Sequence, residues 1–127
     1  MAISQLRSRR KPSGGRYHDA RKKKLHELGS SPWLTKVGVT KRKALRICGG
    51  NTKHIILTAG VVNVFDPATQ KRFTAKIETV TDNPANRNFI RRNIINRGAI
   101  VKTDKGLAKI TNRPSQEGTV NAVLIKA

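Results

Sequence analysis

The most apolar stretches of the chain lie in its second half, as short runs separated by turn-forming residues. Lys53 to Phe65 is the most apolar run and is rich in β-branched residues. Its length and its internal Gly60 predict either one long bent strand or two strands that meet at a bulge. Lys71 to Thr81 alternates apolar and polar residues, which predicts a strand with one apolar face. The pattern in this region is therefore typical of β structure.

Further strands are predicted on either side of these two runs. In Lys41 to Cys48 apolar residues alternate with basic ones, which predicts a strand with one wet, basic face, and Gly49-Gly50-Asn51 follows it as a turn. Ala99 to Thr103 and Leu107 to Thr111 flank an Asp-Lys-Gly turn and predict a hairpin. Thr119 to Lys126 is predicted to be the last strand.

Helices are predicted in only two places. Asp82-Asn83-Pro84 is a helix-start signal, so Pro84 to Asn96 is expected to form a helix of about three turns. Asp19 to Leu28 is expected to form a short helix capped by Asp19. Short strands between turns predict a mainly β fold, in which residues 36–127 form a small antiparallel β-barrel-like domain with one short helix. Residues 1–35 are expected to be a long basic N-terminal extension.

The extension has too little apolar surface to fold by burying it. Nine Lys and Arg residues lie between Arg7 and Lys24, and Leu25 and Leu28 are the main apolar residues near them. The whole chain of 127 residues carries 27 Lys and Arg against 7 Asp and Glu, a net charge of +20. Backbone entropy would outweigh the small apolar area gained on ordering such a segment alone. We therefore expect the extension to take its shape against a polyanion.

The sequence favours nucleic acid over a membrane as this polyanion. No run of 18 apolar residues exists, and no basic segment has the broad apolar face of an interfacial helix. The N-terminal residues lack the apolar region of a secretory signal, and Pro12, Gly14 and Gly15 interrupt the amphipathic helix of a mitochondrial presequence. Cys48 is the only cysteine, which fits a reducing compartment. These features predict a cytoplasmic protein without membrane partners.

The expected contacts to nucleic acid combine charge, backbone and aromatic rings. Lys offers point charge to phosphates, Arg adds bidentate hydrogen bonds, and glycines let backbone amides approach phosphate oxygens. Tyr17 and Trp33 are candidates for stacking on unpaired bases, with the alternative that Trp33 pins the extension to the barrel. The residues predicted to bind RNA are Arg7, Arg9, Arg10, Lys11, Ser13, Gly14, Gly15, Arg16, Tyr17, His18, Arg21, Lys22, Lys23, Lys24, Trp33, Lys36, Lys41, Arg42, Lys43, Arg46, Arg87, Arg91 and Arg92.

The sequence predicts neither catalysis nor a bound cofactor. The seven acidic residues are scattered singly, and no two have the spacing of a catalytic carboxylate pair. The glycine pairs are too short for a phosphate-binding loop of the Walker type. Three histidines and one cysteine without suitably spaced carboxylates do not make a metal site. We therefore expect no enzyme activity, no metal, no cofactor and no small-molecule substrate.

RNA is favoured over DNA because of how the basic residues are arranged. DNA readers usually present a regular helix or ribbon to the major groove. A glycine-interrupted basic extension suits the irregular surface of a large folded RNA, on which it becomes ordered. A DNA-compacting protein is the alternative binding function. An RNA-processing or RNA-modifying enzyme is the alternative activity, but it would need an acid–base pair that the sequence lacks.

One segment resembles a known family. The run KPSGGRYHDARKKKLHELG, Lys11 to Gly29, is similar to the signature of the ribosomal protein S8e family of archaeal and eukaryotic small subunits. Arg42 to Arg46, the Gly-Gly-Asn turn and the Asn-Pro-Ala-Asn stretch are also similar, and the short length resembles archaeal members. The resemblance implies a structural ribosomal protein, active in translation, with a small β-barrel and an N-terminal extension threaded into ribosomal RNA. It implies ribosomal RNA and neighbouring ribosomal proteins as partners, a place in the cytoplasmic ribosome, no enzyme activity and no cofactor.

Overall fold

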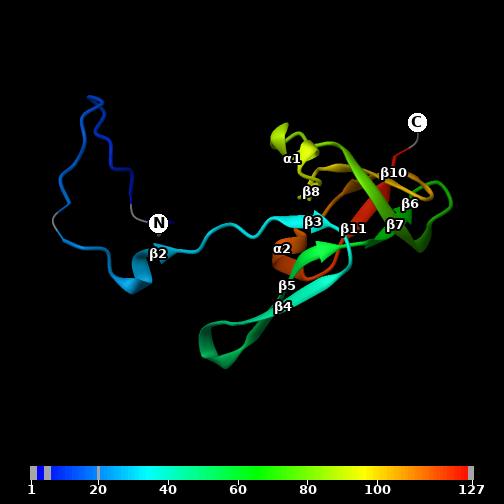
Figure 1. Ribbon diagram of the computed structural model, residues 1–127, viewed down its shortest axis with the longest axis horizontal. Coiled ribbons are helices and arrows are strands. Elements are labelled where there is room, and N and C mark those ends of the chain that lie inside the picture. Colours follow the sequence, from blue (N-terminus) through cyan, green and yellow to red (C-terminus); the bar gives the residue numbers. More distant parts are fainter. Residues whose placement is uncertain (1–2, 5–6, 20, 126–127) are drawn as a thin grey trace. The chain divides into compact units, whose positions relative to one another are not determined.

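The computed structural model describes residues 3–4, 7–19 and 21–125. The chain divides into two compact units, Met1–Pro32 and Trp33–Ala127. We call them the first unit and the barrel unit. Figure 1 colours the first unit blue to light blue and the barrel unit from cyan to red.

Five strands of the barrel unit close into a barrel in the order β10-β11-β6-β7-β9. They are β6 (Val61–Asp66), β7 (Lys71–Asp82), β9 (Ile100–Thr103), β10 (Gly106–Ile110) and β11 (Asn121–Leu124). Neighbouring strands are antiparallel except β6 and β11, which pair in parallel. The predicted mainly β, barrel-like fold is confirmed.

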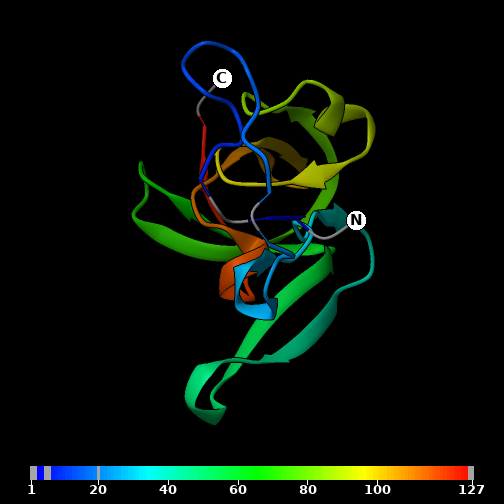
Figure 2. The same ribbon diagram turned by 90° about the vertical axis from the view of Figure 1, so that its left-hand side faces the viewer.

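A second sheet has the strand order β4-β5-β3-β8. It contains β3 (Thr35–Val37), β4 (Lys41–Arg46), β5 (Thr52–Ala59) and β8 (Ile94–Ile95). Among the described residues β4 pairs with β5 alone, and the 3-10 turn η2 (Cys48–Gly50) joins them at the predicted Gly-Gly-Asn turn. Figures 1 and 2 show this hairpin reaching out from the barrel.

Gly60 is the point at which the apolar run from Lys53 to Phe65 passes from one sheet to the other. A Cβ atom on Gly60 would lie 2.9 Å from the carbonyl oxygen of Gly38, so the close backbone approach there requires glycine. The predicted alternative of two strands meeting at this glycine is therefore the correct one, with β5 before it and β6 after it.

The barrel core follows the alternation of apolar residues along the strands. Ala75 and Ile77 of β7 are buried and Phe73 packs against the core, so the predicted apolar face of this strand is confirmed. The core residues come from both sheets and the loops between them: Ile56, Ala59, Val62, Val64, Ala75, Ile77, Val80, Ile95, Ala99, Val101, Ala108, Ile110, Val120 and Ala122.

The helix predicted over residues 84–96 is wrong in length. Helix α1 (Asn88–Arg91) has four residues, and the chain leaves it at Asn93, whose φ is +50°. The next two residues are the buried strand β8, which pairs with β3. The side chain of Asn83 donates to the Ile94 carbonyl at 3.3 Å and accepts from the Ala85 amide at 3.2 Å. Burial of β8 therefore overrides the local helix signal.

A second short helix occupies the predicted loop from Pro114 to Gly118. Helix α2 (Pro114–Glu117) starts with proline, and Gly118 ends it with a φ of +72°. A Cβ atom on Gly118 would lie 2.9 Å from the carbonyl oxygen of His54, so the end of α2 packs tightly on β5.

The first unit contains little regular structure. Strand β1 (Ile3–Ser4) pairs with β2 (Leu28–Gly29), and the 3-10 turn η1 (Leu25–Glu27) precedes β2. The predicted helix from Asp19 to Leu28 is wrong. Leu25 is 88% exposed, so this segment offers no apolar face against which a helix could pack.

Candidate nucleic-acid interface

The backbone of the first unit forms a tight loop between Arg10 and Arg16. An antiparallel bridge joins these residues, and the amide of Lys11 donates to the carbonyl oxygen of Gly15 at 2.8 Å. Gly14 lies in the turn with a φ of +85°, a conformation that favours glycine. The Ser-Gly-Gly segment thus turns the chain and leaves the Arg10, Lys11 and Arg16 side chains exposed.

Tyr17 gathers cations in the same loop. The Arg7 guanidinium carbon lies 4.3 Å from the centre of the Tyr17 ring and the Lys11 Nζ lies 5.5 Å from it. The ring is 38% exposed. Tyr17 therefore holds two of the predicted RNA-binding residues at one place by cation–π attraction.

Glu27 is the buried acid of the first unit. Its carboxylate is 8% exposed. It accepts hydrogen bonds from Arg21 Nη1 at 2.8 Å, from Arg21 Nη2 and from the Lys24 amide at 3.0 Å. The Arg21 side chain and then the Lys24 amide lower the pKa of Glu27 to about 2, because both stabilise the ionised carboxylate. Arg21 is therefore held in place by protein, in contrast to the lysines that follow it.

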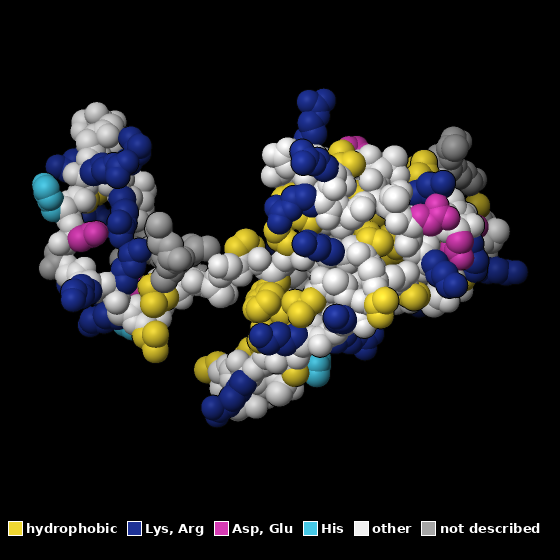
Figure 3. All heavy atoms as spheres, in the orientation of Figure 1, with side chains coloured by type: hydrophobic (Ala, Val, Ile, Leu, Met, Phe, Trp, Pro, Cys, Tyr) yellow, Lys and Arg dark blue, Asp and Glu magenta, His cyan; other side chains and the backbone are white. Residues whose placement is uncertain are grey.

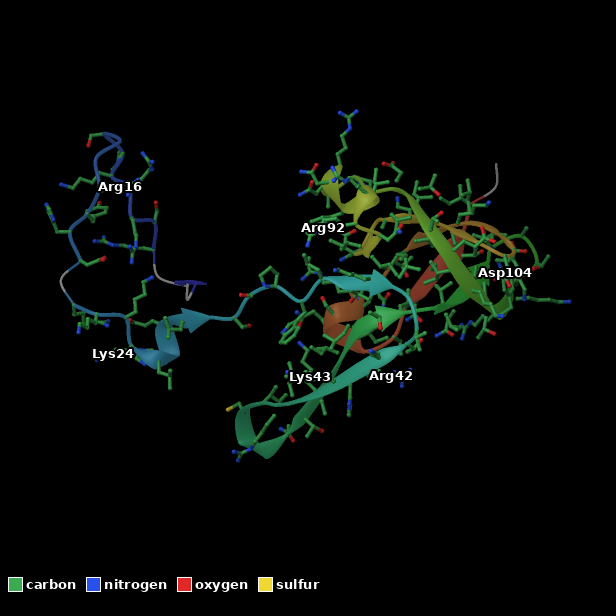
Figure 4. All side chains as sticks on the ribbon, viewed as in Figure 1. Arg16, Lys24, Arg42, Lys43, Arg92 and Asp104 are labelled. Carbon is green, nitrogen blue, oxygen red and sulfur yellow. The ribbon has the colours of Figure 1, made fainter. Side chains whose placement is uncertain are left out.

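Most cations of the first unit have no acidic partner. Asp19 lies 3.6 Å from Arg9 and Glu27 pairs with Arg21, which accounts for both acids of residues 1–32. Within the described residues, the remaining basic side chains form no ion pair: Arg7, Arg10, Lys11, Arg16, Lys22, Lys23 and Lys24. Figure 4 shows Arg16 and Lys24 extending from this unit. The surplus charge remains available for an external anion.

The barrel unit presents its predicted cations on the edge strand β4. All four basic residues of this strand are exposed: Lys41, Arg42, Lys43 and Arg46. Arg42 and Arg46 pair with Ile56 and Thr52 of β5, so they share a face. Lys43 lies on the other face, and its Nζ is 5.0 Å from the Trp33 ring centre. The predicted strand is confirmed, but cations occupy both of its faces, because the adjacent residues Arg42 and Lys43 point to opposite sides of the strand.

The remaining predicted cations lie on β3 and around α1. Lys36 of β3 is exposed. Arg87 precedes α1, Arg91 ends it and Arg92 follows, and all three are exposed without an ion pair among the described residues. Figure 4 shows Arg92 at this part of the barrel unit.

The acidic residues of the barrel unit lie on strands β6 and β7, in the β9–β10 turn and in α2, and none belongs to β4 or α1. Glu78 lies 3.2 Å from Lys102, and the Asp104 carboxylate accepts the Lys76 amide at 3.1 Å. Figure 4 places Asp104 at the opposite end of the barrel unit from Lys43 and Arg92. In Figure 3 most of the acidic side chains on the visible face of the barrel unit lie at that same end. Strand β4 and helix α1 thus carry basic side chains and no acidic one, while Asp82 ends the strand that precedes α1 and Glu117 lies in α2, which packs on β5.

Other kinds of site find no support in the described part of the chain. It contains no group of three or more His, Cys, Asp or Glu side chains able to hold a metal ion. No helix in the described ranges is long and apolar enough to cross a membrane.

A model of one protein family, described as ribosomal protein S8e, matches residues 4–125. The chain belongs to the ribosomal protein S8e family. The S8e relatives include the small ribosomal subunit protein eS8 of Methanocorpusculum labreanum, 48% identical over 122 residues that cover 96% of this chain and 98% of the relative. The protein of the same name from Methanococcoides burtonii is 47% identical with the same coverage. The predicted resemblance is confirmed, and S8e membership supports the expectation that the chain is not an enzyme.

Glu27 was not among the predicted site residues of the S8e chain, although it positions part of the basic surface. Glu27 organises Arg21 and the backbone of Lys24, yet an acid in a basic segment gives no direct signal for binding. Its only sequence signal is that it is the single acid within the last part of the signature, Arg21 to Gly29.

Proposed function

We propose that the protein is a structural constituent of the small ribosomal subunit and binds ribosomal RNA through its basic N-terminal extension and the basic barrel surface. The observation that carries the proposal is the 48% identity, over 96% of this chain, to a protein named for the small ribosomal subunit. This function places the protein in the cytoplasmic ribosome, with ribosomal RNA and neighbouring ribosomal proteins as its partners.

The charge distribution supports RNA as the direct ligand. Unpaired Lys and Arg side chains of the first unit and of β4 neutralise phosphates and release counterions. Because both faces of the β4–β5 hairpin carry cations, the protein can bring phosphate-rich segments together and hold them. No covalent chemistry is required.

The extension and the barrel divide this work. The turn at Ser13, Gly14 and Gly15 brings backbone and arginine side chains close to phosphates. The Trp33 ring contacts Lys43 Nζ within the barrel unit. This contact favours the interpretation that Trp33 anchors the chain to the barrel, and it disfavours the alternative that Trp33 stacks on a base. Burial of Thr35, which is 1% exposed, supports ending the RNA-binding extension at Pro32 instead of residue 35.

Co-sedimentation tests this function. The tagged protein is expected to sediment with small ribosomal subunits through a high-salt wash, because many phosphate contacts and neighbouring proteins hold it. Release of all protein at moderate salt would contradict its role as a constituent.

A DNA-compacting protein is the competing binding function. Affinities for folded ribosomal RNA and for duplex DNA, measured at matched salt, separate the two. We expect tighter binding to the folded RNA, because the extension is an irregular loop without a regular recognition helix. Equal or tighter binding to duplex DNA would favour the alternative.

A further inference from the structure

A groove crosses the outer face of the barrel along β7, β6 and β11. It has a volume of about 490 Å³. These three strands are neighbours in the barrel, as Figure 1 also shows. None of the residues predicted to bind RNA lies in these strands.

The side chains facing the groove are those that alternate with the core. In β6, Val62 and Val64 are buried inside the barrel, so Asn63 and Phe65 face outward. The register places Arg72 and Val123 beside Phe65, and Thr74 and Asn121 beside Asn63. The face therefore carries one row centred on an aromatic ring and an adjacent row of amides and hydroxyls.

The Asn63 and Asn121 side chains can form hydrogen bonds to the edge of a planar ligand. Asn63 Nδ2 donates to Asn121 Oδ1 at 3.1 Å, which couples the two side chains. Within the described residues, nothing else hydrogen-bonds to Asn63 Oδ1 or Asn121 Nδ2. One acceptor and one donor are thus left on two side chains that a hydrogen bond joins, and the edges of nucleobases offer the same complementary combination.

The aromatic row supplies a stacking surface and charge. Phe65 is half-buried and lies between Arg72 of β7 and Val123 of β11. Lys109 of β10 lies beyond Val123 in the same row and is exposed. No acidic residue is found among the described residues that line the groove. An aromatic ring flanked by cations suits a base with its phosphate.

We propose that this outer barrel face binds one unpaired nucleotide of RNA. The base stacks on Phe65, its edge pairs with Asn63 and Asn121, and Arg72 and Lys109 contact the flanking phosphates. The proposal extends the proposed function, because ribosomal RNA would supply the nucleotide.

An acidic peptide fits the face less well. The carboxylates of such a peptide offer only acceptors, so they match Arg72 and Lys109 but not the Asn63 acceptor, which only a peptide amide could then meet. The carboxylates would also leave Phe65 without a planar partner.

The first test is a titration of the full-length protein with single nucleoside monophosphates, followed by the NMR signals of the Asn63 and Asn121 side-chain amides. Ribose 5-phosphate is the control ligand, because it carries the phosphate without the base. We expect saturable shifts with the nucleotides and much smaller shifts with ribose 5-phosphate. Equal shifts with both would reduce the groove to an anion site and overturn base recognition, and no shifts would overturn the site.

Variants locate the contact. Phe65→Leu keeps an apolar side chain but is expected to weaken nucleotide binding about tenfold, within the range known for base–aromatic stacking. Arg72→Gln should also weaken binding. Lys71→Gln, which removes the same charge from the neighbouring position outside the groove, should not. If Lys71→Gln and Arg72→Gln weaken binding equally, a diffuse charge effect replaces the proposed site.

The second test identifies the occupant in assembled small subunits. A chain with p-azidophenylalanine in place of Phe65 is cross-linked by light. An adduct to an RNA nucleotide supports the proposal, whereas an adduct to another protein alone, or no adduct, contradicts it. The titration uses the free protein, so its failure leaves membership in the small subunit intact. Failure to sediment with subunits likewise leaves the titration result standing.

Discussion

Glu27 shows how one acidic residue can order a cationic segment. Its carboxylate accepts from the Arg21 guanidinium and the Lys24 amide, and so fixes the turn that carries Lys22 and Lys23. The sequence could identify the basic residues here, since charge is a property of composition. It could not identify the role of Glu27, since a hydrogen bond six residues along the chain depends on the turn between them.

The Glu27 carboxyl is expected to titrate at an unusually low pH. Its pKa is about 2 in the folded chain against an ordinary value of 4.5. Because the folded pKa is the lower one, the carboxylate stabilises the turn above about pH 4.5, and this contribution is lost as the pH falls through about 2. The Glu27 side-chain carbon signal, followed by NMR from pH 6 to about pH 1.5, measures the midpoint.

Glu27→Gln is the matched control for this titration. It keeps the shape of the side chain but removes the charge, so the low-pH change in the signals of residues 21–27 should disappear. A midpoint near 4.5 in the unaltered chain would show that Arg21 does not hold the carboxylate in solution.

Gly118 and Gly98 separate two reasons for which a backbone position requires glycine. Both have positive φ, but a Cβ on Gly118 would also meet the His54 carbonyl oxygen, whereas nothing lies within 4 Å of a Cβ on Gly98. Gly118→Ala is expected to lower the free energy of unfolding by at least about 2 kcal/mol. Gly98→Ala should lower it by about 1 kcal/mol. Denaturant unfolding measures both, and equal losses would mean that α2 is not packed tightly against β5.

At the scale of elements, local patterns were sufficient where each strand alternates and each turn is marked. β7 and the β9–β10 hairpin follow directly from apolar spacing and the Asp-Lys-Gly turn. The length of α1 was mispredicted because β8 pairs with β3, far away in the chain, and no local signal reports that pairing. Helix α2 was not predicted because four residues make only about one turn, which is too short for a helical repeat of apolar residues to be recognised.

The basic turn from Lys22 to Lys24 is expected to account for part of the salt dependence of RNA binding. None of these lysines has an acidic partner among the described residues. Replacing all three with Ala should reduce the slope of log affinity against log salt by about 2–3. Filter binding or fluorescence anisotropy with folded ribosomal RNA, over a series of salt concentrations, gives the slope.

A triple variant at the acid-rich end of the barrel is the control. Lys71, Lys102 and Lys105 carry the same total charge, but Lys102 is already paired with Glu78. Their replacement with Ala should leave the slope nearly unchanged. Equal slopes for both triple variants would remove Lys22 to Lys24 from the interface.

At the scale of the whole molecule, the sequence predicted the class of fold, the family and the uneven distribution of charge. The exposure of the basic residues could be predicted because burying a charged side chain is costly, so most of them lie on the surface. The arrangement of these residues was not predictable, since the Arg10–Arg16 bridge and the two-faced charge of β4 depend on backbone pairing.

Removing residues 1–32 tests the division of the chain. The barrel unit contains every member of the main core cluster, so this deletion should leave its melting temperature nearly unchanged. It should nevertheless cost most of the affinity for RNA, because nine of the 27 Lys and Arg residues are lost. Thermal unfolding followed by circular dichroism, together with RNA binding, measures both effects.

Removing residues 1–35 is the informative comparison. The longer deletion also removes Trp33 and Thr35, whose hydroxyl donates to the Ile56 carbonyl at 2.8 Å within the protein. It should lower the melting temperature by several degrees, as the loss of about 1–2 kcal/mol does in a domain of this size. Unfolding of the shorter deletion would show that the extension is needed for the fold.

The position of β11 has a consequence for synthesis. This strand lies between β6 and β10, so the barrel can close only after translation has reached Leu124. Until then β6 and β10 each keep an unsatisfied edge, which is prone to pairing with other chains. A chain whose translation stops before β11 would therefore be prone to aggregate, and only a chain that includes β11 pairs both edges. The cationic segment precedes the barrel in the chain, so a nascent copy carries this charge before its barrel is complete.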